Sequence, residues 1–82
     1  MVKLRIGSNM SVGAVGNVRI LFSYDTPVAC LHQVHGYMKT DKKWSRTTAQ
    51  HIAKWLRTNP GFSIAYGVQT MPQEYFDALI ES

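Results

Sequence analysis

Apolar and polar residues alternate in three segments of the chain, and this two-residue period is typical of strands with one face on a core. The three segments are residues 2–6, 18–24 and 62–68. In the first of them, Val2, Leu4 and Ile6 are expected to face the core, and the charged residues between them are expected to face away.

The region around the second segment predicts a hairpin. The two faces of residues 28–38 are less distinct, which suits a strand flanked by neighbours, and we expect this strand to return beside residues 18–24. A turn from Asp25 to Pro27 joins the two, because Asp and Pro favour turns. Residues 7–17 contain several Gly, Ser and Asn residues, which favour a loop.

Two further segments have the 3.6-residue apolar period of amphipathic helices. In residues 44–57 the apolar stripe comprises Ala49, Ile52, Ala53 and Leu56. Thr47 and Gln50 have the spacing of a capping box at its start, and Pro60 prevents its continuation. A second pair, Thr70 and Gln73, precedes the stripe formed by Met71, Tyr75, Phe76, Leu79 and Ile80.

The element order β-β-β-α-β-α predicts a single α+β domain over residues 1–82. We expect a two-layer sandwich in which a four-stranded sheet carries both helices on one face. One core is expected to contain the apolar positions of these elements, Phe22, Ile52, Leu56, Ile64, Phe76 and Leu79. The other sheet face is expected to display Lys3, Arg5 and Arg19.

Charge is distributed unevenly along the chain. Residues 1–57 hold all nine Lys and Arg and two acidic residues, a net charge of +7, whereas residues 58–82 carry a net charge of −3. A basic surface is the usual footprint of an anionic partner. The chain has one cysteine and no run of about 20 apolar residues, so we expect a cytoplasmic protein that does not enter a membrane.

The cations concentrate in a connection and in the helix that follows it. The candidate binding residues, which we call the basic ridge, are Lys39, Lys42, Lys43, Trp44, Arg46, His51, Lys54 and Arg57. Cations mixed with aromatic side chains are typical of phosphate and base contacts. Cations ahead of a helix oppose its dipole, which favours a functional reason for their presence. In a competing structural interpretation, Trp44 merely anchors the loop to the first helix.

Catalytic and metal chemistry find little support in the sequence. Cys30, His32 and His35 suggest metal ligands, but on a strand the third points away from the first two, and no second ligand cluster is present. Cys30 lies among apolar residues, which favours packing over nucleophilic catalysis. No carboxylate pair suits acid–base catalysis. We therefore expect a protein that is not an enzyme and needs no metal or other cofactor.

Three groups of residues carry a family resemblance. They are Ser23 to Val28; Trp44 to Thr48 with His51, Ile52, Trp55 and Leu56; and Pro72 to Asp77. Over residues 18–80 the chain resembles a family of very small tailed-bacteriophage proteins with a domain of unknown function. The resemblance implies a viral protein in the host cytoplasm with a non-enzymatic accessory role, and it implies no binding residues.

Three functional hypotheses remain open. In the first, the basic ridge binds nucleic acid electrostatically. In the second, Trp44 and the same basic surface dock on an acidic host protein and inhibit it. In the third, the protein is a homo-oligomeric structural component, with Trp44, Tyr37 or the N-terminal loop at the interface.

Overall fold

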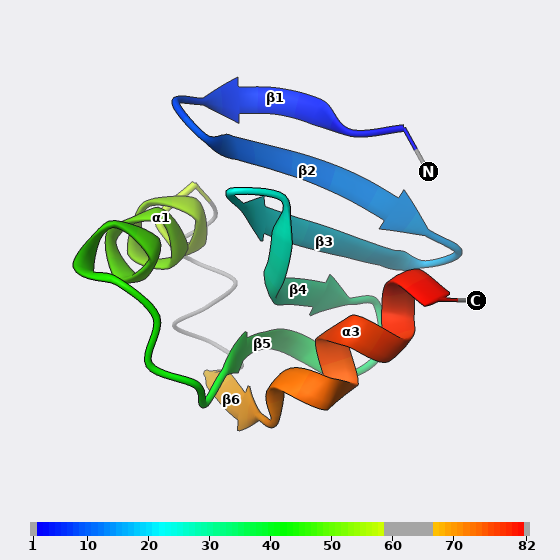
Figure 1. Cartoon of the computed structure of the whole chain (residues 1–82). Coiled ribbons are helices and arrows are strands. Elements are labelled where there is room, and N and C mark those ends of the chain that lie inside the picture. The colour runs from blue at the N-terminus through cyan, green and yellow to red at the C-terminus, as the bar shows by residue number, and fades with distance from the viewer. Residues whose placement is uncertain (1, 59–66, 82) are drawn as a thin grey trace.

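The computed structural model describes residues 2–58 and 67–81 (Figure 1). Six strands form one sheet, in the spatial order β1-β2-β3-β4-β5-β6. The strands are β1 (Leu4–Gly7), β2 (Met10–Val15), β3 (Val18–Ser23), β4 (Thr26–His32), β5 (Gly36–Thr40) and β6 (Val68–Met71). The described helices are α1 (Arg46–Leu56), between β5 and β6, and α3 (Gln73–Glu81), at the C-terminal end.

The first five strands form an antiparallel meander, and β6 adds to β5 in parallel. Short turns join the antiparallel strands. The parallel pair needs a crossover, which α1 begins on one face of the sheet. The predicted α+β class is confirmed, but the sheet has six strands instead of the four expected.

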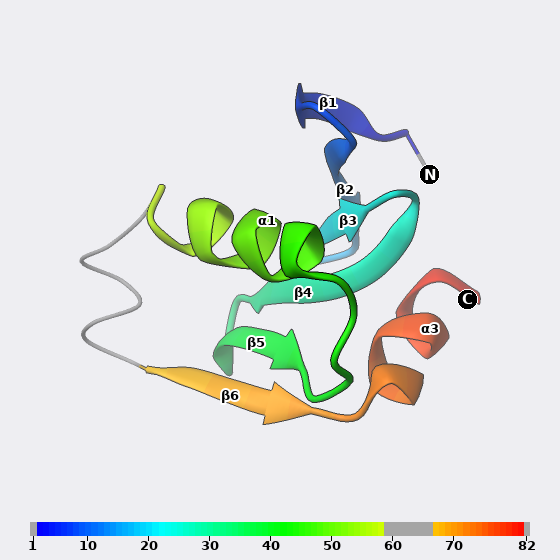
Figure 2. The ribbon, with the colours of Figure 1, turned by 60° about the vertical axis from the view of Figure 1, so that its left-hand side comes forward.

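The two helices cover opposite faces of the sheet (Figure 2), so the expectation that both lie on one face is wrong. On β3, Ile20 and Phe22 pack in the same cluster as Phe76 of α3, whereas Leu21 packs in the cluster that contains Trp55 of α1. Because successive side chains of a strand point to opposite faces, the two clusters lie on the two sides of the sheet. The architecture is a three-layer α/β/α sandwich.

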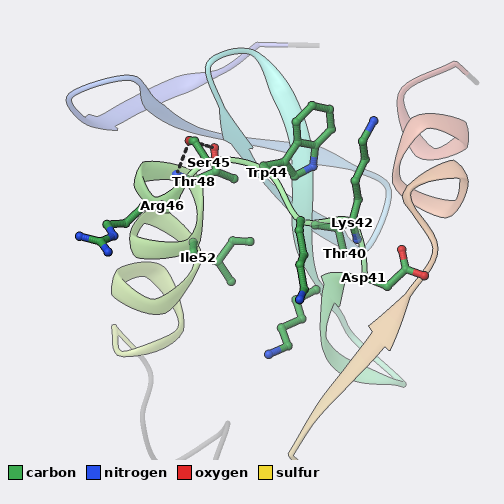
Figure 3. A pocket seen from close by; sticks show the side chains of 11 residues that line it. Thr40, Asp41, Lys42, Trp44, Ser45, Arg46, Thr48 and Ile52 are labelled. Carbon is green, nitrogen blue, oxygen red and sulfur yellow. Dashed lines mark hydrogen bonds between the residues drawn. The ribbon is translucent and has the colours of Figure 1, made fainter.

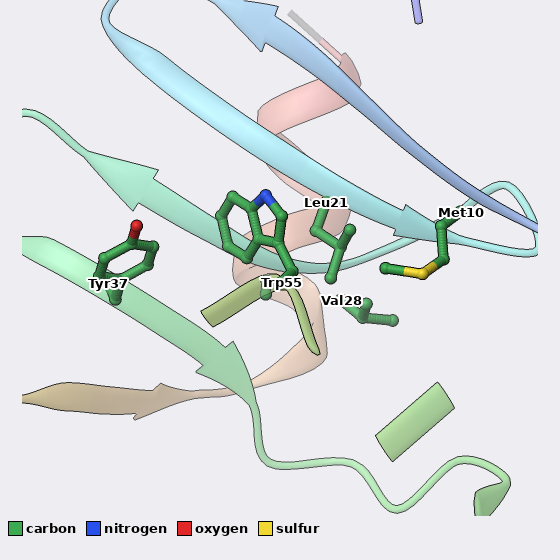
Figure 4. Close-up of a cluster of buried hydrophobic side chains, with 6 residues drawn as sticks. Met10, Leu21, Val28, Tyr37 and Trp55 are labelled. Atoms are coloured by element: carbon green, nitrogen blue, oxygen red, sulfur yellow. The ribbon is translucent and has the colours of Figure 1, made fainter. Parts of the chain in front are cut away.

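The predicted single core is therefore two cores. Figure 4 shows the cluster under α1, where the Tyr37 and Trp55 rings meet edge to face with centroids 5.4 Å apart. Ile52 and Leu56 pack against this cluster, whereas Leu79 packs against the α3 cluster. The strand predicted at residues 62–68 begins at Val68 in the structure, and its earlier part, Ile64 included, lies outside the described residues.

The sequence did not predict two of the six strands. One was expected to be a loop, and the other was expected to be part of a single long strand. Residues 10–15 form β2, which pairs along its whole length with β3. Residues 28–38 are interrupted by the turn between β4 and β5. Tertiary pairing with a long apolar neighbour outweighed the weak local strand propensity of the Gly-containing segment.

The turn between β3 and β4 also lies earlier in the sequence than predicted. Tyr24 and Asp25 form it with φ angles of 50° and 65°, and Pro27 belongs to β4. The register of the β3–β4 pair shifts next to Pro27. Proline has no N–H to donate to the ladder, so it is accommodated at such an irregularity.

Strand β1 does not face a core as its alternation predicted. Val2, Leu4 and Ile6 are 90%, 71% and 42% exposed. The reason is position, because β1 is the outermost strand and the helices cover the inner ones. Lys3 and Arg19, which were expected together on one open sheet face, are separated: Lys3 lies over the Phe22 ring on the α3 side, whereas Arg19 borders a hollow beside α1. Within the described residues, no helix is long and apolar enough to cross a membrane.

Candidate nucleic-acid interface

Helix α1 begins two residues earlier than the predicted capping box, which started at Thr47. Its N-cap is Ser45, whose Oγ accepts a hydrogen bond from the Thr48 backbone N–H at 3.2 Å. Arg46 is the first helical residue, and the first turn contains no acidic side chain. The basic residues therefore crowd the positive end of the helix dipole without compensation, which costs a few tenths to about 1 kcal/mol.

The loop between β5 and α1 and the first turns of α1 enclose an open hollow of about 380 Å³ (Figure 3). We call it the basic hollow. Four cationic side chains and one carboxylate line it, together with Trp44 and small or apolar residues of α1. The charged residues are Lys39, Asp41, Lys42, Lys43 and Arg46.

Trp44 is held in place at the rim of this hollow. Its indole N–H donates to Oε1 of Gln73 at 3.1 Å, and the Lys42 ammonium lies 4.1 Å from the centroid of its ring. The side chain remains 40% exposed. Trp44 is thus an anchor, as the structural interpretation expected, but it is hydrogen-bonded to α3 instead of α1.

Gln73 is a residue whose importance the sequence did not reveal. Its Oε1 also accepts from the Thr40 hydroxyl at 2.7 Å. Its Nε2 donates to the Pro27 carbonyl oxygen at 2.7 Å and to Asp77 Oδ1 at 3.1 Å. One amide therefore ties β4, β5, the basic loop and α3 together. The only sequence signal was its spacing from Thr70, which suggested a helix cap and not a tertiary junction.

His51 does not belong to the exposed ridge. It is 8% exposed, and its Nδ1 lies 2.8 Å from the Ser23 Oγ, which in turn is 3.0 Å from the Thr48 hydroxyl. The Tyr24 ring packs beside it, with centroids 5.7 Å apart. Buried polar groups are nearly always hydrogen-bonded, and here the partners come from two elements. The hydrogen bonds of Ser23 to His51 and Thr48 therefore link α1 to β3. The buried stripe of α1 is consequently Thr48, His51 and Trp55, rotated from the predicted stripe, and Ala49 and Ala53 are exposed.

The structure divides the remaining candidates. Lys54 borders a second hollow of about 340 Å³ on the other flank of α1, together with Arg19 and mainly apolar residues from β1, β2, β4 and β5. Arg57 is exposed at the C-cap, where its backbone N–H donates to the Ala53 carbonyl oxygen at 3.2 Å. Only five of the eight predicted residues gather at the basic hollow: Lys39, Lys42, Lys43, Trp44 and Arg46.

The cysteine and histidines have other environments. Cys30 is fully buried in the α3 cluster, and this burial raises the pKa of its thiol to about 11. A thiol with that pKa is protonated at neutral pH and is a poor nucleophile. His32 Nδ1 accepts hydrogen bonds from the backbone N–H groups of Val34 and His35, which shapes the β4–β5 turn. Among the described residues, no three His, Cys, Asp or Glu side chains are placed to hold a metal ion.

Comparison with known proteins places the chain in a family. The family described as "Family of unknown function (DUF8033)" matches residues 3–77, which is most of the chain. No curated protein and no solved structure matches the chain. The resemblance to a family of unknown function is confirmed at that level. The chain belongs to the family of unknown function DUF8033.

Proposed function

We propose that the protein binds nucleic acid through the basic hollow. The observation that carries the proposal is that four cationic residues, Lys39, Lys42, Lys43 and Arg46, line one open hollow that contains a single carboxylate, that of Asp41. Phosphate groups are attracted to such a surface, and binding releases their condensed counterions. Long cationic side chains around a hollow can contact several phosphates at once.

The distribution of acidic residues supports the same orientation. Glu74, Asp77 and Glu81 all belong to α3, which covers the sheet face opposite to α1. The acidic side chains of α3 and the basic side chains of α1 thus belong to helices on opposite faces of the sheet. Such a dipole orients a polyanion toward the basic hollow during encounter and accelerates association at low ionic strength.

The proposal includes the setting that the sequence resemblance implies, a small accessory protein of a tailed bacteriophage in the host cytoplasm. An acidic host protein is the alternative partner for the same surface. Trp44 favours this alternative less than a tryptophan without intramolecular partners would, because its N–H and one ring face are already occupied. Tyr37 is 1% exposed and is excluded from any interface of the folded chain.

Replacing Lys42 and Lys43 together by Ala should weaken nucleic-acid binding and lower its salt dependence. The slope of log affinity against log salt should fall by up to about 0.9 for each lost phosphate contact on duplex DNA. Both side chains are exposed, so the free energy of unfolding should change by less than about 1 kcal/mol. Fluorescence anisotropy over a salt series measures the slope, and urea denaturation measures the stability.

The matched control removes two cations elsewhere, with Lys3→Ala and Arg5→Ala on the N-terminal segment. These residues border a different hollow, beside Asp25 and Tyr24. The control should keep the parent's salt slope. Equal loss of slope in both double variants would mean non-specific attraction to net charge. Absence of binding by the parent at low salt would reject nucleic acid as the partner and leave the acidic host protein.

Self-association is a second candidate, favoured by the apolar side chains exposed on the edge strand. Leu4 and Ile6 lie on β1 and Val2 directly precedes it, and β1 is an edge strand that could pair with the same strand of a second copy. Leu4→Glu should then shift a dimer to a monomer in sedimentation equilibrium. A parent that sediments as a monomer at every concentration measured would remove this candidate.

A further inference from the structure

The exposed side of α1 carries a stripe of residues that faces away from the sheet. Arg46, Gln50, Ala53 and Arg57 recur at helical spacing, and all four are exposed. This stripe lies opposite the buried stripe of Thr48, His51 and Trp55. Resting on the proposed function, we infer that α1 binds in the major groove of duplex DNA and that Gln50 contacts a base edge there.

Cations lie on both flanks of this helix. On one side are Lys39, Lys42 and Lys43 around the basic hollow, and on the other are Lys54 and Arg19 around the second hollow. Two phosphate backbones border the major groove, which is about 12 Å wide and admits one α-helix. A helix with cations on each side therefore matches a groove with a backbone on each side. The helix itself carries no acidic residue to oppose the approach.

Duplex DNA fits this surface better than single strands or duplex RNA. Single strands are usually bound by stacking bases on free aromatic faces. Trp44, the aromatic side chain of the basic hollow, is fixed by Gln73 and covered on one face by Lys42. The major groove of A-form RNA is too deep and narrow for a helix to enter.

Gln50 is placed to read sequence. A glutamine amide can donate a hydrogen bond to N7 of adenine and accept one from the N6 amino group of the same base. This bidentate pair distinguishes adenine from the other bases. Within the described part of the chain, the Gln50 side chain has no hydrogen-bond partner, so its amide is available. Its neighbours on the exposed side include Ala49 and Ala53, whose short side chains permit close approach.

The test selects bound sequences from a library of 20-base-pair DNA duplexes with random centres. We expect enrichment of a short sequence with adenine at a fixed position. The preference for adenine should fall at least about fivefold in Gln50→Ala, with an unchanged salt slope, because the lost contact is to a base and not to a phosphate. Gln33→Ala, which removes the same amide from the exposed β4–β5 turn, should keep the preference.

Each outcome separates this inference from the proposed function. No enrichment, or a preference that survives Gln50→Ala, overturns base reading by Gln50. Tighter binding of the separated single strands than of the duplex overturns insertion of α1 in the groove. In both cases nucleic-acid binding through the basic hollow stands, and it fails only if no form of DNA or RNA binds at low salt.

Discussion

Phe76→Ala should lower the free energy of unfolding by about 3–5 kcal/mol, which is a large part of the 5–15 kcal/mol available to a typical domain. Phe76 has no exposed surface and is the buried residue through which α3 packs on Ile20, Phe22, Cys30 and Met38. The truncated side chain leaves a cavity between helix and sheet that neighbouring residues fill only in part. Urea denaturation followed by circular dichroism measures the change.

Ile80→Ala is the matched control on the same helix. Ile80 is 41% exposed, and its truncation should cost less than about 1 kcal/mol. A Phe76→Ala variant as stable as the parent would contradict the packing of α3 on the sheet. If Phe76→Ala is too unstable to purify, Phe76→Leu provides the comparison with a smaller loss.

Gln73→Ala should cost about 2–5 kcal/mol of the free energy of unfolding, although it removes no large apolar surface. It removes the side-chain donor to the Pro27 carbonyl oxygen and the acceptor of the Thr40 hydroxyl, which keeps only the hydrogen bond from the Lys42 N–H, and each buried unsatisfied group costs about 1–3 kcal/mol. The Trp44 indole N–H loses its acceptor as well. Gln69→Ala, an exposed glutamine on the adjacent strand β6, should be close to neutral.

Gln73→Glu distinguishes loss of hydrogen bonds from loss of volume. A carboxylate still accepts from Thr40 and Trp44, but it cannot donate to Pro27 and it faces the carboxylate of Asp77. The variant should therefore be less stable than the parent at pH 7 and recover part of the loss as the pH falls and the new carboxyl is protonated. Equal stability of Gln73→Glu and the parent at pH 7 would contradict the proposed role of Nε2 as a donor.

Local sequence patterns identified the elements whose signals are strong and short in range. Residues 18–24 alternate strictly and form β3, and the 3.6-residue periods correspond to α1 and α3. The same patterns misplaced the faces of these elements. On α1, the apolar period favours a stripe through Ala49 and Ala53 over one through Thr48 and His51, because the sequence does not show that Ser23 provides a buried hydrogen-bond partner for the hydroxyl and imidazole groups.

The residues of the candidate site were likewise predictable from the sequence only in part. The basic character of residues 39–46 follows from the sequence, but which of these cations line one hollow depends on how the loop leaves β5 and enters α1. The exclusion of His51 and the separation of Lys54 from the loop lysines depend on the rotation of α1 about its axis. Neither charge nor spacing encodes that rotation.

The α+β class, the two helical segments, the central strand and the basic connection are predictable from the sequence alone, because each rests on residues that are neighbours along the chain. Only the tertiary structure decided that the helices lie on opposite faces of six strands, that Gln73 joins four segments, and which cations share a surface. These features depend on contacts between residues far apart in sequence. Their free energies come from burial and hydrogen bonding in the assembled fold and leave no periodic signal in the chain.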